Sequence, residues 1–181
     1  MDVLVALHAA AALLLLVAGL AKIVRPAPTT ELLSTLGLPD IAALAVAIGV
    51  AESVIGIAAL VIGGPVTAAA TGVLYAGFVV VVWRALAAGA TSCGCFGRVD
   101  APPSWIHVVG NVGLAAVSFV AMGGDTPIEL MDGQPAGGAG FVLLVGVLAG
   151  LALVMFTALP EAIGARRGAA AAAQFHIEDG A

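Results

Sequence analysis

The chain has 181 residues, of which 62% are hydrophobic and only 9% are charged, and its mean hydropathy is +1.18. A soluble domain usually carries about 25% charged residues, so this chain has too little polar surface to cover a water-facing exterior. Its six Lys and Arg residues occur singly or in one pair, which excludes the basic patch that nucleic-acid binding requires. The composition therefore predicts an integral membrane protein that has the lipid bilayer as its main partner.

Five apolar runs are long enough to cross a bilayer, since about 20 helical residues span its hydrocarbon core. The first run follows Asp2 rather than a positive leader, so we interpret it as a retained helix and not as a cleaved signal peptide. The sequence predicts an all-α integral membrane protein, with a four-helix transmembrane bundle in residues 1–122 and a fifth, C-terminal transmembrane helix. The predicted spans are residues 3–23, 41–62, 66–83, 104–122 and 141–159.

The connections between the spans hold most of the prolines and polar residues. Residues 25–40 contain three prolines and are expected to include a short helix at the membrane surface. The tight turn at Gly63-Gly64-Pro65 predicts that the second and third spans are antiparallel neighbours. We expect residues 123–140 to form a flexible acidic loop and residues 160–181 to form a poorly ordered cytoplasmic tail.

The basic residues predict the orientation of the chain in the membrane. With five crossings, all six of them fall on one side, which the positive-inside rule makes cytoplasmic. The N-terminus is then expected outside, and the connection between the third and fourth spans is expected in the cytoplasm. The six residues are Lys22, Arg25, Arg84, Arg98, Arg166 and Arg167.

Glu52 most needs an explanation, because it lies near the middle of the second span. A charged carboxylate there costs at least about 2.5 kcal/mol on insertion scales. One interpretation is a polar site, shared with Tyr75 of the third span, that carries a proton or binds a cation or a quinone. The other is a structural carboxyl that is hydrogen-bonded to a neighbouring helix, with Tyr75 as a candidate partner. Lys22 and Arg25 are expected to extend to the membrane surface, and Gly19 is expected to allow close helix packing.

Cys93 and Cys95 are the only two cysteines, and they lie in a glycine-bearing connection rather than in a span. A disulfide across the single residue Gly94 would be strained and readily reduced, and nearby Arg98 would favour the thiolate. These features favour thiol–disulfide exchange. Two alternatives remain: an inert local role, and capture of a soft ion such as Cu(I). Two thiols are too few for zinc, so no metal site is assigned.

His107 and Asn111 are four residues apart and so share one face of the fourth span, near the cysteine connection. His107 is a candidate catalytic proton acceptor for a cysteine thiol. The alternative is a polar residue at a helix start that meets the lipid headgroups. His8 is expected at the opposite membrane surface.

Several segments together resemble the methylamine utilisation protein MauE family, within the DoxX-like membrane proteins. The resemblance spans roughly residues 3 to 122. The most specific segment is Ser92-Cys93-Gly94-Cys95-Phe96-Gly97. The other matching segments are Ala18-Gly19-Leu20-Ala21-Lys22, Arg25-Pro26, Leu36-Gly37-Leu38-Pro39, Glu52 with Gly56, Ser104-Trp105 and Asn111.

The resemblance implies a multi-pass protein of the bacterial cell membrane that supports the maturation of a disulfide-containing partner. For the family's namesake this partner is the small subunit of methylamine dehydrogenase, and a thioredoxin-like protein, MauD, is the usual companion. We expect a membrane thiol–disulfide oxidoreductase or an accessory to one. The alternatives are a non-catalytic membrane assembly factor, and a small transporter or metal-handling protein centred on Glu52. An exported partner would favour cysteines outside, whereas the basic residues place them in the cytoplasm. Either the protein passes electrons across the membrane, which would need a second redox group such as a quinone or a partner protein, or the positive-inside rule misleads for this chain.

Overall fold

The computed structural model describes residues 3–91, 94, 101–123, 126–128 and 135–178. Five helices in this part of the chain are long and apolar enough to cross a membrane. The predicted all-α membrane fold is therefore confirmed. The helices are α1 Val3–Val24, α2 Ala27–Thr35, α3 Ala42–Val61, α4 Gly64–Ala88, α5 Trp105–Val120, the short 3₁₀ helix η2 Ala121–Gly123, and α7 Pro135–Glu178.

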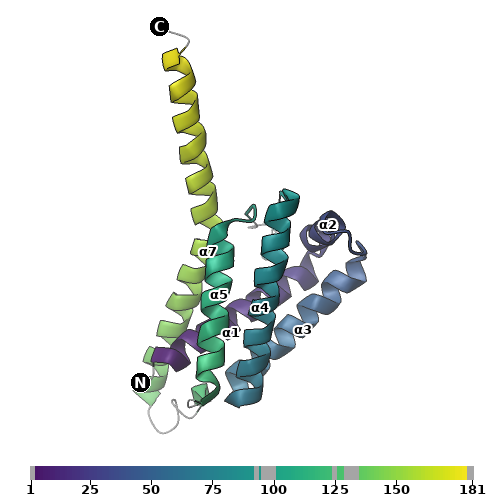
Figure 1. Cartoon of the computed structure of the whole chain (residues 1–181). Coiled ribbons are helices and arrows are strands. Elements are labelled where there is room, and N and C mark those ends of the chain that lie inside the picture. The colour runs from purple at the N-terminus through teal and green to yellow at the C-terminus, as the bar shows by residue number, and fades with distance from the viewer. Residues whose placement is uncertain (1–2, 92–93, 95–100, 124–125, 129–134, 179–181) are drawn as a thin grey trace.

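Helix α1 runs obliquely through the middle of the bundle (Figure 1) and packs against α3, α4, α5 and α7. In its most apolar stretch, 61% of the residues are buried, against 17–33% in the other four spans. Six of the twelve buried residues of α1 are alanines, which let its neighbours approach closely from several sides. The outer helices turn large apolar side chains outward, as lipid-facing surfaces require.

Helices α1 and α3 are in backbone contact through glycines. A Cβ atom added at Gly19 would lie 2.5 Å from the carbonyl oxygen of Gly49, and one added at Gly56 would lie 2.8 Å from the carbonyl oxygen of Ala12. Any side chain at these positions would push the helices apart. The predicted close packing at Gly19 is thus confirmed, and α3 is the partner.

Helix α2 is the predicted short helix, and it begins directly after Pro26. Proline is well suited to the first helical turn because the missing N–H has no partner there. Its buried residues are Thr29, Leu32 and Leu33, and it contacts α1, α3 and α4. It therefore lies at the end of the bundle where α1 and α4 finish and α3 starts (Figure 1).

Helix α7 differs from the expected short span with an irregular tail. It continues through Pro160 to Glu178, and its second half projects away from the bundle (Figure 1). The φ angle of proline suits a helix, and the residues that follow are rich in alanine, which has the highest helix propensity. These propensities outweigh the loss of one backbone hydrogen bond at Pro160.

Arg25 directly follows α1, Arg84 lies near the end of α4, and Arg166 lies in the second half of α7, and all three are exposed. These three segments lie toward the same end of the molecule (Figure 1). This arrangement agrees with five crossings and with basic residues gathered on one side. The side of the membrane on which they lie stays a prediction.

Candidate functional site

A buried ion pair joins α1 to α3. The ammonium of Lys22 donates to Oε2 of Glu52 at 2.8 Å, and the two side chains are 6% and 0% exposed. The expectation that Lys22 extends to the membrane surface is therefore wrong. Because Gly19 lets α3 approach α1 just before Lys22, the lysine side chain meets the carboxylate instead of turning toward water.

The ion pair has an aromatic neighbour on one side and an unsatisfied oxygen on the other. The Lys22 nitrogen lies 5.7 Å from the centre of the Phe78 ring, within range of a cation–π interaction. The second carboxylate oxygen of Glu52, Oε1, has no hydrogen-bond partner among the described residues. Such a pair remains stable in an apolar interior only while both partners are present.

Tyr75 makes a different contact from the one considered in the sequence. Its hydroxyl donates to the carbonyl oxygen of Ala11 on α1 at 2.7 Å, while Glu52 pairs with Lys22. Tyr75 and Lys22 both line the same internal cavity, whereas Glu52 does not line it and is linked to it only through its ion pair with Lys22. Binding of a cofactor there stays a prediction.

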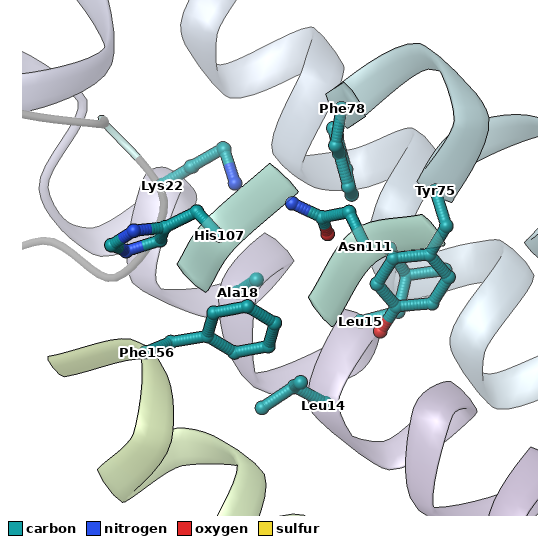
Figure 2. Close-up of a pocket in the computed structure, with 9 residues that line it drawn as sticks. All are labelled: Leu14, Leu15, Ala18, Lys22, Tyr75, Phe78, His107, Asn111 and Phe156. Atoms are coloured by element: carbon teal, nitrogen blue, oxygen red, sulfur yellow. The ribbon is translucent and has the colours of Figure 1, made fainter. Parts of the chain in front are cut away.

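The cavity lies between α1, α4, α5 and α7. Its volume is about 20 Å³, which suffices for about one water molecule. Figure 2 shows the amide of Asn111 and the ammonium of Lys22 pointing toward each other across it. Its other polar and aromatic lining residues are Tyr75, Phe78, His107 and Phe156. A space of this size and polarity suits a bound water.

His107 faces this cavity from the first turn of α5. Its Nδ1 atom is hydrogen-bonded to the hydroxyl of Ser104 at 2.8 Å, and its ring stacks on Phe156 with centroids 5.4 Å apart. The side chain is 1% exposed. His107 and Asn111 are thus both buried on one face, as the spacing predicts, and His107 points into the bundle rather than toward headgroups.

His8 is also an interior residue, although the sequence suggested the membrane surface. Its side chain is 5% exposed, and its Nδ1 atom lies 3.3 Å from the hydroxyl of Ser118 on α5. Ser118 follows His107 by eleven residues, about three helical turns, and so lies on the same face of α5. This spacing is the sequence signal that Ser118 faces the interior, where it can be a polar partner of His8.

Cys93 and Cys95 lie outside the described residues, whereas Gly94 between them is described. Gly94 is buried, and its carbonyl oxygen accepts a hydrogen bond of 2.9 Å from the hydroxyl of Thr29 on α2. A second contact joins the Thr91 hydroxyl to the carboxylate of Glu31 at 3.4 Å. Sequence reasoning missed this role of α2, because nothing in the pattern of an isolated nine-residue helix indicates a partner 65 residues away.

Five apolar spans, a buried ion pair and a polar cavity define a multi-pass α-helical membrane protein. The family model described as methylamine utilisation protein MauE matches residues 1–124. The match covers more than half of the chain, and the protein therefore belongs to this family. The matched segment contains α1 to α5 with Lys22, Glu52 and His107, and it leaves α7 outside. Comparison with the curated proteins and with the solved structures gave no match.

Proposed function

We propose that this protein is a membrane accessory of methylamine utilisation that performs or assists thiol–disulfide exchange on a disulfide-containing partner. Membership of the MauE family supports the accessory role. In the exchange, a cysteine thiolate of the pair attacks a disulfide of the partner and forms a mixed disulfide. The second cysteine then closes the Cys93–Cys95 disulfide, and the partner leaves with two thiols. The reverse sequence oxidises the partner, and a thioredoxin-like protein of the MauD type is the expected exchange companion.

The observation that carries this proposal is the anchored residue between the two cysteines. The Thr29 hydroxyl holds the carbonyl of Gly94, and Gly94 has a φ of +67°, which favours glycine. A dithiol that exchanges needs a defined backbone, because a disulfide across one residue is strained and depends on local geometry. An inert pair of cysteines would not require such a contact.

His107 is the proposed proton acceptor for the thiol that becomes the attacking thiolate. Its hydrogen bond with Ser104 and its stacking on Phe156 fix the ring orientation. Fixing the ring in this way lowers the cost of aligning it for proton transfer.

Thiol trapping tests the exchange. After membranes are equilibrated with oxidant or reductant, alkylation with a heavy maleimide should convert the wild-type chain between an unmodified and a doubly modified form. When reduced, the single variants Cys93→Ser and Cys95→Ser should each bind one reagent, and the variant that lacks the resolving cysteine should accumulate a mixed disulfide with the partner. Since the chain has no other cysteine, the double variant is a blank control. Full maturation activity in cells that carry the double variant would contradict the proposal and favour a non-catalytic assembly factor.

The predicted orientation has its own test. A membrane-impermeant maleimide added to intact cells should leave the reduced Cys93 and Cys95 unlabelled, and permeabilisation should make both reactive, because the positive-inside rule places their connection in the cytoplasm. A cysteine introduced at exposed Val3, at the opposite end of the bundle, into the chain lacking both native cysteines is the matched control and should label in intact cells. Labelling of the native pair without permeabilisation would reverse the orientation.

A further inference from the structure

A series of polar groups leads from the buried ion pair to the basic end of the bundle, where α1 and α4 finish. The Lys22 ammonium donates to Glu52 at 2.8 Å and lines the water-sized cavity together with His107. On its other side, the His107 ring is hydrogen-bonded through Nδ1 to the Ser104 hydroxyl at 2.8 Å. The connection therefore consists of a hydrogen bond, a space for one water molecule and a second hydrogen bond.

Ser104 is the outer end of this series. It directly precedes the membrane span Trp105–Gly123 and is partly exposed. It also lines a groove of about 310 Å³ formed by the start of α5, the end of α4 and α7. Trp105, which lines the same groove, is 65% exposed, and tryptophan is typical of the membrane–water interface. Water can therefore reach the Ser104 hydroxyl without entering the lipid.

The cavity is walled by apolar side chains toward the opposite end of the bundle. Leu14 and Leu15 lie about two turns before Lys22 on α1 and line the cavity (Figure 2). The buried polar contact between His8 and Ser118 does not belong to the cavity lining. The polar series therefore leads from the ion pair toward the basic end.

The titratable groups that line the cavity come from three helices. They are Lys22 on α1, which pairs with Glu52 of α3, Tyr75 on α4 and His107 on α5. Helix α7 contributes the ring of Phe156, which does not titrate. The Tyr75 hydroxyl donates to a carbonyl of α1 in the interior. Among the described residues, His107 is therefore the titratable group that connects the cavity with the basic end.

We propose that His107 and Ser104 form a proton path through which the buried Lys22 ammonium exchanges protons with water at the basic end. The inference goes beyond the proposed thiol exchange, and no cysteine takes part in it. In the outward direction, the ammonium gives a proton to the cavity water, which passes one of its own protons to Nε2 of His107. Nδ1 then releases a proton to the Ser104 oxygen, and the Ser104 hydroxyl releases its original proton to water in the groove.

The same steps in reverse return a proton from the groove to Lys22, so every group ends the exchange with the protons it had at the start. A neutral imidazole can perform both steps, because one ring nitrogen accepts a proton while the other releases one. The bond to Ser104 and the stacking on Phe156 hold the ring in place for transfer. The ion pair with Glu52 keeps the ammonium beside the cavity.

Lys22 is the only lysine in the chain, so its exchange can be observed alone. Full-length protein labelled with lysine that carries ¹⁵N at the side-chain nitrogen is reconstituted in bilayers and transferred to heavy water. Solid-state ¹⁵N NMR then follows the replacement of the ammonium protons by deuterons. His107→Phe keeps an aromatic ring against Phe156 but removes both ring nitrogens. It should slow the exchange at least about tenfold, because positioned acid–base groups contribute about 10²–10⁴-fold to proton transfer.

Three further variants come from α5 and its first turn. Ser104→Ala should also slow the exchange, and Ser104→Thr, which restores a hydroxyl, should recover it. Ser118→Ala is the matched control, because Ser118 is a buried serine on the same face of α5 that contacts His8 instead, and it should leave the rate unchanged. Far-ultraviolet circular dichroism checks the fold of each variant.

Two results would overturn the proposal: exchange in His107→Phe at the wild-type rate, or an equal slowing in Ser118→Ala. If His107→Phe does not fold, the comparison of Ser104→Ala with Ser118→Ala decides. Slower exchange in Ser104→Ala alone supports the path, and equal rates in these two variants refute it.

Discussion

Replacing Lys22 with methionine should destabilise the bundle by about 3–5 kcal/mol, the usual effect of removing one partner from a buried ion pair. The substitution conserves the length and much of the volume of the side chain. It leaves the fully buried Glu52 carboxylate without the ammonium that pairs with it at 2.8 Å. Glu52→Gln should also be destabilising, because it leaves the lysine charge in the interior. Unfolding in mixed micelles, followed by far-ultraviolet circular dichroism, measures the free-energy change.

A double substitution distinguishes the cost of leaving one buried charge unpaired from the cost of changing the two side chains. Lys22→Met combined with Glu52→Leu removes both charges and should be more stable than either single charge-removing variant, since apolar replacements of whole buried pairs are often tolerated. Arg25→Met is the matched control, because Arg25 lies one turn further on and is exposed. It should change stability by less than about 0.5 kcal/mol. A double variant less stable than both single variants would show that the pair is not the stabilising unit.

Two glycine-to-alanine substitutions should have effects of opposite sign. Gly19→Ala should destabilise the protein by about 1–3 kcal/mol, the range for overpacking. Its new Cβ atom would lie 2.5 Å from both the Gly49 carbonyl oxygen and the Ser53 hydroxyl, so α1 and α3 must separate. Separation also strains the contact between Lys22 and Glu52, and the effect should fall in the upper part of that range.

Gly77→Ala is the control for Gly19→Ala. Gly77 lies on α4 with nothing within 4 Å of an added Cβ atom. Alanine there gains helix propensity, about 1 kcal/mol over glycine, without a clash. The same micelle unfolding assay compares the two variants. Equal shifts in one direction would show that helix propensity, and not the contact between α1 and α3, governs both positions.

The spans could be predicted from the sequence because hydrophobic length is a local property. The ion pair could not, because it depends on how α1 is tilted and rotated against α3. Lys22 lies in the last turn of α1, whereas Glu52 lies near the middle of α3. From the sequence, the two residues are therefore expected at different depths in the membrane, which gives no reason to pair them. The oblique path of α1 (Figure 1) and the contact at Gly19 bring the two together.

The candidate site was predicted in part. The spacing of His107 and Asn111 placed both on one buried face, since helical periodicity needs no knowledge of neighbours. The contact between Thr29 and Gly94 joins segments 65 residues apart and depends on the docking of α2. At Pro160 two local signals compete, because proline suggests a helix end whereas the alanine-rich residues after it favour a helix. The helix propensity of the alanines outweighs the proline, and α7 continues to Glu178.

The central position of α1 has a consequence for biosynthesis. Of the helices in the described part of the chain, α1 leaves the ribosome before the others, and it finishes in the middle of the bundle. Lys22 is synthesised 30 residues before its partner Glu52, which at about 5–20 residues per second is a delay of about 2–6 s. During that interval the lysine has no carboxylate to pair with in the bilayer. Helix α1 must therefore stay near the insertion machinery or the membrane surface until α3 emerges, and the pairing of the two helices is the step that commits α1 to the interior.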